Sequence, residues 1–441
     1  MNLSMFGFSR KFINDSFWSL FGNLVSVFSG LAVVKIITKL VAVDDYGKAS
    51  LVLGVVALLN GLIMGPLLVA HMRVYFDYLK NEAALWYARV FNLVFGAAGL
   101  LALLIYVLIA YGYNFRGNNI FVTLIVPAAL MIFAQPYVSA VSNYLEAHRL
   151  YFRLAMVNIS QKLFCPIILI LLLIAAFSGS YAIVLSQAIS IAAVFLIFRV
   201  ISEQKAFDKK PAYNWKEFIK IKASFASFGF SLPLGYVIHW VLSTSDRYLI
   251  QHYMTLDDVG IYAMNYALWS IPYSMLIGWL EILVRPHLYG KAVKNDWQGV
   301  KQIIFWRTIF AFIVSVVGTL FIYMWGEFIA ELLLGKGYWV GWQLMMLIAI
   351  AHCICILGQS VMAVFLASKN TKIILVATST AAMVNLGINL VAIPNYGLLG
   401  AAMSTLIAYF IWSAILVLWS CVHLQHLIRY NVLPEEKLNT C

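Results

Sequence analysis

Charged residues are scarce in this chain: Asp, Glu, Lys and Arg make up 11% of its 441 residues, whereas hydrophobic residues make up 63%. Soluble domains carry about 25% charged residues, so this composition excludes a water-soluble fold. The longest polar stretches, residues 201–222 and 423–441, are too short to form a domain. We therefore expect no attached catalytic domain and no nucleic-acid partner, and we assign the net charge of +12 to loops at one membrane surface.

Cysteine is also rare, and the nucleotide and nucleophile motifs are missing. The 5 cysteines lie in or beside apolar segments or at the C-terminus, a distribution typical of packing thiols rather than of a disulfide framework. One stretch holds His352, Cys353 and Cys355, but a metal site needs more ligands than these three residues. The sequence contains no phosphate-binding loop, Rossmann fingerprint or nucleophile elbow. We expect no cofactor and no metal, and a protein that is not an enzyme.

Long hydrophobic runs fill the chain, whose mean hydropathy is +0.89. Because a membrane helix needs about 20 apolar residues, the sequence accommodates about 12 spans. The runs are longer than barrel strands and do not alternate, which favours an all-α polytopic membrane protein. The predicted spans are 15–40, 46–72, 84–111, 119–145, 152–177, 181–200, 223–246, 259–286, 303–325, 339–367, 372–393 and 397–422.

The positions of Lys and Arg predict the orientation of these spans. With the N-terminus inside, most of the 30 basic residues fall in inner loops, so both termini are predicted to be cytoplasmic. The basic stretch 201–222 is interpreted as a cytoplasmic linker that contacts membrane lipids.

A short pattern occurs twice, as IITKLVAVDDYG at 36–47 and LIQHYMTLDDVG at 249–260. Both copies join the first and second spans of a six-span set, which predicts a duplication with both halves in the same orientation. The expected domains are a six-helix lobe at 1–200, the linker at 201–222, a second six-helix lobe at 223–422 and a tail at 423–441. The Asp pair of each copy either caps the following helix or takes part in transport.

The first span of each half carries a stripe of small polar residues, which spans roughly 80° in the first half and roughly 120° in the second. Such a stripe is either a close helix-packing surface or the wall of a wet cavity. Ionisable groups in the second stripe favour the cavity, and Pro233 permits a bend that would act as a gate. The stripe residues are Ser16, Ser19, Asn23, Ser26 and Gly30, and then Ser224, Ser227, Ser231, Gly235, His239 and Asp246.

Residues 228–268 resemble the centre of the polysaccharide transporters of the multidrug/oligosaccharidyl-lipid/polysaccharide exporter superfamily, which include Wzx-type O-antigen flippases. The pattern comprises Gly229 and Pro233, Asp246-Arg247-Tyr248 and Val259-Gly260-x-Tyr262, with Asp45-Tyr46-Gly47 in the first half and Ile393-Pro394-x-x-Gly397-x-x-Gly400 before the last span. The resemblance implies two six-helix lobes around a V-shaped cavity, lined mainly by spans one, two, seven and eight.

The resemblance also implies a function. We expect an undecaprenyl-pyrophosphate-linked oligosaccharide to pass from the cytoplasmic to the periplasmic leaflet of the bacterial inner membrane, for O-antigen or similar lipopolysaccharide biosynthesis. A polysaccharide polymerase and a chain-length regulator are the implied protein partners. Two alternatives stay open: a cation-coupled multidrug exporter of the same superfamily, and a membrane O-antigen polymerase.

A pyrophosphate cargo calls for cations in the cavity. Arg suits phosphate oxygens through its bidentate fork, whereas Lys acts as a point charge, and for each residue snorkelling to head groups is the alternative. Asp246 either pairs with Arg247 or couples transport to H+ or Na+, and Glu281 is either a helical partner for Arg285 or a further coupling or gating candidate. The candidate cations are Arg73 and Arg285 near the inner ends, Lys35, Lys39 and Arg247 near the outer ends, Lys162 within span five and His239 within span seven.

Overall fold

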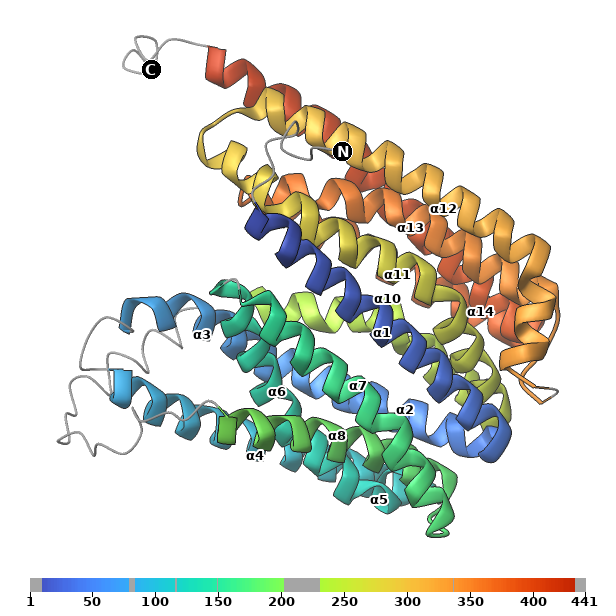
Figure 1. The fold of residues 1–441 in the computed structure, drawn as a ribbon. Coiled ribbons are helices and arrows are strands. Elements are labelled where there is room, and N and C mark those ends of the chain that lie inside the picture. The colour runs from blue at the N-terminus through green and yellow to red at the C-terminus, as the bar shows by residue number, and fades with distance from the viewer. Residues whose placement is uncertain are drawn as a thin grey trace. The chain divides into compact units, whose positions relative to one another are not determined.

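The computed structural model describes residues 10–78, 84–115, 117–148, 150–201, 231–335 and 337–432. Within these ranges every regular element is a helix, as Figure 1 shows. Ten helices of the described residues are long and apolar enough to cross a membrane. The predicted all-α membrane class is therefore confirmed. The basic linker after Ile201, Ser227 and the end of the predicted tail lie outside the described residues.

The chain divides into two compact units, Met1–Trp240 and Val241–Cys441. We call them the N-terminal unit and the C-terminal unit. The predicted domain limits stay a prediction, because the start of the second predicted lobe lies in residues that the structure does not describe. Helix α10 begins in the first unit and ends in the second.

The N-terminal unit contains one helix or helix pair for each predicted span. In chain order these are α1 (Arg10–Leu40), α2 (Val43–Leu59) continued by the π-helix η2 (Asn60–Met64) and α3 (Gly65–Tyr78), α4 (Ala84–Phe115), α5 (Ile120–Thr123) with α6 (Ile125–Ala147), α7 (Tyr151–Ile174) and α8 (Gly179–Ile201).

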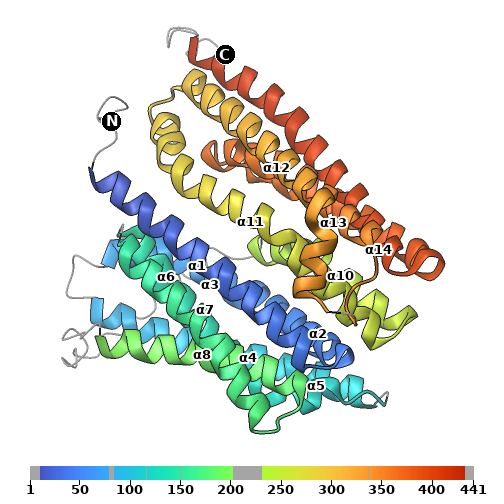
Figure 2. The same cartoon turned by 45° about the vertical axis from the view of Figure 1, so that its right-hand side comes forward.

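Packing in the N-terminal unit follows the apolar faces of these helices. Helix α1 lies along α7, and α8 packs against α7, α6 and α2, an arrangement that Figures 1 and 2 both show. A core cluster joins η2, α3, α4 and α6 through Met64, Ala70, Phe91, Phe95 and Ala140.

The C-terminal unit holds the second part of α10 (Ser231–Tyr253), then α11 (Leu256–Val293), α12 (Trp297–Leu333), α13 (Trp342–Ala367) and α14 (Thr371–Val432). Helix α13 packs against α14, α12 and α11 and is the most buried of the apolar helices. Helix α14 covers two predicted spans, which separate at Gly397, where φ is 57° and ψ is −134°. Only glycine adopts this backbone conformation readily, so the residue ends one span and starts the next.

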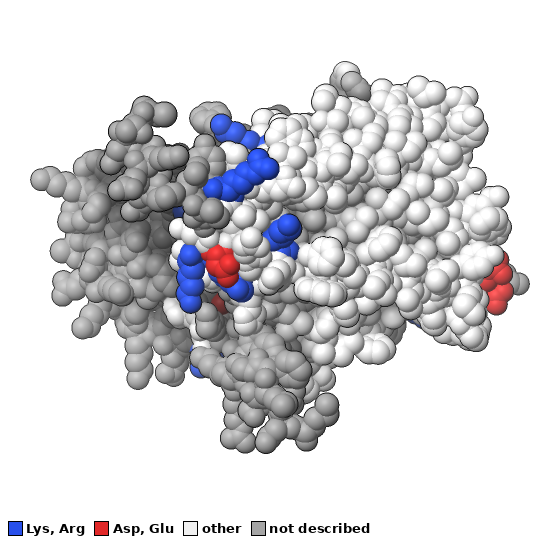
Figure 3. All heavy atoms as spheres, turned by 90° about the horizontal axis from the view of Figure 1, so that it is seen from above, with Lys and Arg blue, Asp and Glu red and all other residues white. Residues whose placement is uncertain are grey.

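Large apolar side chains cover the outside of α12. Trp306, Val317, Met324 and Phe328 are each more than half exposed. On the face in Figure 3, a broad area without charged side chains separates a group of basic and acidic residues from an acidic group at the far end. Such a surface is incompatible with water and suits hydrocarbon flanked by two polar interfaces.

Candidate functional site

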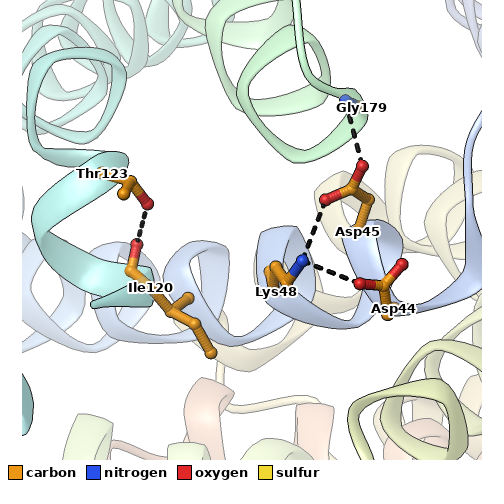
Figure 4. Close-up of polar contacts among 6 residues, drawn as sticks. All are labelled: Asp44, Asp45, Lys48, Ile120, Thr123 and Gly179. Carbon is orange, nitrogen blue, oxygen red and sulfur yellow. Dashed lines mark hydrogen bonds and ion pairs between the residues drawn. The ribbon is translucent and has the colours of Figure 1, made fainter. Parts of the chain in front are cut away.

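The Asp pair of the first repeat forms an ionic cluster at the start of α2. Lys48 Nζ donates to Asp44 Oδ2 at 2.8 Å and to Asp45 Oδ1 at 3.3 Å. Asp45 Oδ2 also accepts from the backbone N–H of Gly179, the first residue of α8, at 3.2 Å, as Figure 4 shows. Both carboxylates lie in the first turn of α2, where they complement the helix dipole. The cluster therefore ties the start of α8 to the start of α2.

The second repeat uses Asp258, one residue of its Asp pair, in a capping box. Thr255 Oγ1 accepts from the backbone N–H of Asp258 at 3.2 Å, and Asp258 Oδ2 accepts from the backbone N–H of Thr255 at 3.0 Å. This reciprocal pair satisfies two of the free donors at the start of α11. The capping interpretation is confirmed for Asp258. In the first repeat the N-cap is Ala42, and the carboxylate of Asp45 caps α8 instead.

The polar stripe of α1 borders the contact between α1 and α7. A Cβ added at Gly22 would lie 3.3 Å from the Cβ of Ala155, and Ser29 Oγ donates to the backbone carbonyl of Lys162. Ser26 Oγ donates to the Gly22 carbonyl at 2.8 Å, and Asn23 is partly exposed beside it. Small residues thus let the backbones of α1 and α7 approach closely next to the stripe.

Lys162 lies on the exposed side of α7, in the middle of the helix, one turn beyond the exposed Asn158. Its backbone carbonyl accepts from Ser29 of α1, and the residue is exposed in the N-terminal unit. An ammonium held at the middle of a bilayer is costly, so such residues usually face water or a polar ligand.

The other candidate cations of the N-terminal unit lie at helix ends. Lys39 is exposed in the last turn of α1, and Lys35 lies one turn earlier and is partly exposed. Arg73 belongs to α3, but its side chain lies outside the described residues. The structure therefore brings Lys35 and Lys39 to one end of α1 and leaves the contacts of Arg73 undescribed.

The first half of α10 packs on the π-helix that follows α2. Trp240 Nε1 donates to the carbonyl of Gly54 at 2.8 Å. The ring of Tyr236 lies against two glycines, so that a Cβ added at Gly61 would be 3.2 Å from it and one at Gly65 only 2.5 Å. Gly61 and Gly65 are small residues four positions apart, and this spacing is a sequence signal for close packing of another helix.

Three further candidates lie in this half of α10. His239 is exposed, and Pro233 is a partly exposed residue of the described part of the helix. Ser231 begins the described helix, and its side chain is outside the description.

The C-terminal unit encloses a buried carboxylate. Asp246 is 3% exposed. Its Oδ2 accepts from the hydroxyl of Tyr262 at 2.7 Å, and its Oδ1 accepts from the backbone N–H of Arg247 at 2.8 Å. The Tyr262 hydroxyl also lies 3.4 Å from Thr405 Oγ1, which links α10, α11 and α14. A buried carboxylate depends on such donors, because burial of a charge without hydrogen bonds is costly.

Aromatic hydroxyls extend this network. The hydroxyls of Tyr266 and Tyr409 are 2.7 Å apart, and the guanidinium carbon of Arg247 lies 6.0 Å from the ring centre of Tyr266. The ring of His352 lies 5.0 Å from that of Tyr266 and 5.7 Å from that of Tyr409. Sequence reasoning found Asp246, Arg247 and the Tyr262 motif but missed the partners on α13 and α14.

A second ionic group joins α11 and α12, and only its Arg307 is buried. Arg285 Nε donates to Glu281 Oε2 at 3.2 Å, so the predicted helical partnership is confirmed. Arg307 Nη2 donates to Glu281 Oε1, and the Arg307 side chain is 1% exposed. We did not predict Arg307 as a partner, because its position relative to Glu281 depends on how α11 and α12 pack.

No group of three or more His, Cys, Asp and Glu residues suited to a metal ion occurs in the described part of the chain. Among the groups of candidate residues, the α1–α7 face with Lys162 belongs to the N-terminal unit, and the Asp246–Tyr262 network and the Glu281–Arg307 pair belong to the C-terminal unit.

Comparisons with known proteins identify the family and the fold. A family model described as "Polysaccharide biosynthesis protein" matches residues 36–340. The structure is similar to an inward closed conformation of the lipid II flippase MurJ, at 15% identity with a TM-score of 0.70, over 92% of this chain and 87% of that one. No curated protein matches the sequence.

Two solved transporters of the MOP superfamily share the fold at 12% identity. An inward-facing multidrug resistance MATE family transporter matches with a TM-score of 0.68, over 92% of this chain and 96% of that chain. A MOP-superfamily transporter from Pyrococcus furiosus matches with a TM-score of 0.66, over 95% of this chain and 96% of that chain. The family model covers more than half of the sequence, and the chain therefore belongs to the polysaccharide biosynthesis protein family, with the helical fold of the MOP-superfamily transporters.

Proposed function

We propose that this chain is a flippase that moves an undecaprenyl-pyrophosphate-linked oligosaccharide repeat unit, of the O-antigen type, from the cytoplasmic to the periplasmic leaflet by alternating access. The family match over residues 36–340 and the fold shared with a lipid II flippase support this proposal. In this role the protein lies in the bacterial inner membrane with both termini in the cytoplasm. It delivers the repeat unit to a polysaccharide polymerase, which acts together with a chain-length regulator.

The exposed ammonium of Lys162 in the middle of α7 is the observation that carries the proposal. A glycan and a pyrophosphate cannot cross hydrocarbon, whereas a polyprenyl tail remains in it. A hydrated path for the polar part needs cations to receive the pyrophosphate, and Lys162 beside Asn158 supplies one at mid-span. Arg285 and Arg73 then serve the cytoplasmic side, with Lys35, Lys39 and Arg247 on the periplasmic side.

Asp246 is our candidate for coupling. It is buried, and it joins α10 to α11 and α14 through Tyr262 and Thr405, so a change in its charge acts on three helices at once. Binding of H+ or Na+ would remove or neutralise that charge. The membrane potential adds to the driving force, because an inside-negative potential favours outward movement of an anion by about 2.3 kcal/mol per charge per 100 mV.

A cation-coupled multidrug exporter is the second candidate, and the fold shared with MATE family transporters favours it. The two functions differ in cargo, so the products that accumulate when the protein is absent separate them. The decisive experiment is a deletion in the native organism, followed by mass spectrometry of lipid-linked sugars and electrophoresis of surface glycans.

The flippase proposal expects single repeat units on undecaprenyl pyrophosphate to accumulate facing the cytoplasm while the surface polymer disappears. Normal glycans with altered drug sensitivity would instead establish the exporter. Unpolymerised single units at the cell surface would assign the protein as a polymerase.

Point variants test the proposed residues in the same assay. Lys162→Gln and Arg247→Gln should each reduce surface polymer at unchanged protein level, because a lost charge-assisted contact costs about 1.5–3 kcal/mol. Lys372→Gln is the matched control, an exposed lysine in the first turn of α14. Equal polymer in both variants and in the control would remove these cations from the mechanism.

A further inference from the structure

Arg307 of α12 is a buried cation, and some of its N–H donors have no acceptor among the described residues. Its side chain is 1% exposed, and Nη2 donates to Glu281. The remaining nitrogens, Nε and Nη1, are buried without a hydrogen-bond partner among the described residues. A guanidinium has five N–H donors, and a buried charged donor without an acceptor is costly.

The charge around Arg307 is also unbalanced. Glu281 is shared between Arg307 and Arg285, whose Nε donates to its second oxygen at 3.2 Å. Two guanidinium groups on one carboxylate leave one net positive charge. The group therefore favours an additional anion rather than another cation.

A groove of about 480 Å³ runs beside Arg307 between α11 and α12. Its wall consists of Arg307 and Gln302 together with apolar side chains, among them Leu280, Val284, Trp306 and Phe310. Along α12, Gln302 is nearest the α11–α12 turn and Phe310 is farthest from it, and along α11 Val284 is nearer that turn than Leu280. Gln302 is therefore the polar residue at the end near the turn, and Arg307 lies farther along α12 among apolar side chains.

The depth of the groove matches the boundary between head groups and acyl chains. The apolar span of α11 ends at Arg285, and Glu281 lies one helical turn, about 6 Å, inside that end. Trp306 is 67% exposed and Phe310 is 45% exposed, as expected for aromatic side chains at the lipid surface. Basic residues of the turn region, Lys294 and Lys301, are exposed nearby.

We propose that this groove binds an anionic membrane phospholipid in the leaflet on the side of the α11–α12 turn, which the distribution of Lys and Arg predicts to be cytoplasmic. The head-group phosphate accepts from Arg307 after a small turn of its side chain, and Gln302 donates to the same head group at the mouth. One acyl chain lies along Leu280 and Phe310. Lipid binding here does not require the proposed cargo, but the two sites are neighbours, because Arg285, a candidate for binding that cargo, shares Glu281 with Arg307.

Native mass spectrometry of the purified full-length protein tests this site. Protein in detergent is titrated with phosphatidylglycerol or with phosphatidylcholine of the same chains. We expect phosphatidylglycerol to bind more tightly than phosphatidylcholine. Arg307→Gln should weaken phosphatidylglycerol binding by roughly tenfold to hundredfold, since a charge-assisted contact is lost. Lys372→Gln removes an equal charge elsewhere and should leave binding unchanged.

A second variant covers the case in which Arg307→Gln does not fold. Gln302→Glu places an anion at the mouth of the groove without touching the Glu281–Arg307 pair, and it should weaken phosphatidylglycerol binding selectively. Gln298→Glu is the matched control, because this exposed residue lies one turn away on α12 and does not line the groove. Equal phosphatidylglycerol binding by the two glutamate variants would overturn the proposal.

Inorganic phosphate separates a lipid site from a simple anion site. Because the acyl chain contributes to binding, millimolar inorganic phosphate should not displace phosphatidylglycerol from the wild-type protein. Displacement by inorganic phosphate that depends on Arg307, together with equal affinity for the two lipids, would refute the assignment of a lipid.

Discussion

Replacing Tyr262 by Phe tests whether Asp246 carries a charge in the C-terminal unit. The change deletes only the hydroxyl that donates to Asp246 Oδ2 at 2.7 Å. Tyr262 is fully buried and Asp246 is 3% exposed, so water does not replace the lost donor readily. A hydrogen bond to a charged group contributes about 1.5–3 kcal/mol, against about 0.5–1.5 kcal/mol for a neutral pair. We therefore expect Tyr262→Phe to lower the free energy of unfolding by the larger amount.

Tyr266→Phe supplies the matched control in the same helix. It breaks the 2.7 Å bond between two neutral hydroxyls, those of Tyr266 and Tyr409, and should cost only the smaller amount. The assay is equilibrium unfolding in mixed micelles of increasing SDS content, followed by circular dichroism. In a thermal melt, a unit of this size shifts by about 2–4 °C per kcal/mol, so the two variants should differ measurably.

A double-mutant cycle with Asp246→Asn isolates the Asp246–Tyr262 pair. If the carboxylate is charged, the coupling energy between Asp246→Asn and Tyr262→Phe should be about 1.5–3 kcal/mol. Equal losses for Tyr262→Phe and Tyr266→Phe, with a coupling energy below about 0.5 kcal/mol, would refute the reasoning. Asp246 would then be a neutral packing residue and a poor candidate for coupling.

Three further predictions concern other elements. Gly397→Ala should lower the free energy of unfolding by about 1–3 kcal/mol, because an alanine is strained at a φ of 57°. Gly387→Ala should not destabilise the chain, because Gly387 is helical and has open space for a Cβ. Unfolding in SDS measures both free energies. The Lys291 ammonium donates to Asp296 and holds the pKa of that carboxyl below its usual value. The ionised Asp296 therefore stabilises the start of α12 above about pH 4, and this stabilisation is lost as the pH falls through the lowered pKa. Unfolding midpoints of the wild type and Asp296→Asn should therefore differ more at pH 7 than at pH 3. Pro233→Ala should slow surface-glycan export by stiffening α10, and an unchanged rate would discard the gate.

The sequence predicted the helices well because hydrophobic length alone requires them. Predicted spans 152–177 and 181–200 correspond to α7 (Tyr151–Ile174) and α8 (Gly179–Ile201). Helices extend beyond the predicted spans where polar residues follow, as in α11, which continues to Val293. Hydropathy marks the part of a helix that lipid covers, whereas backbone hydrogen bonds continue past it.

Candidate residues within one helix were also predictable. Glu281 and Arg285 are four residues apart, which places them on one helical face whatever the tertiary structure. The Asp pairs before the second spans of both halves were expected at helix starts, and Asp258 is in a capping box. Local geometry determines such contacts, so spacing in the sequence is enough to find them.

Contacts between helices depended on the tertiary structure. The bonds of Asp246 with Tyr262, of Arg307 with Glu281 and of Trp240 with Gly54 each join different helices. These bonds form only at a particular rotation of each helix about its axis and a particular axial position relative to its neighbour. A helix that is apolar on all sides has no pattern from which either quantity can be predicted. Hydropathy and residue spacing are therefore enough to predict the membrane class, the helices and the local pairs, whereas side-chain packing fixes which polar groups meet inside each unit.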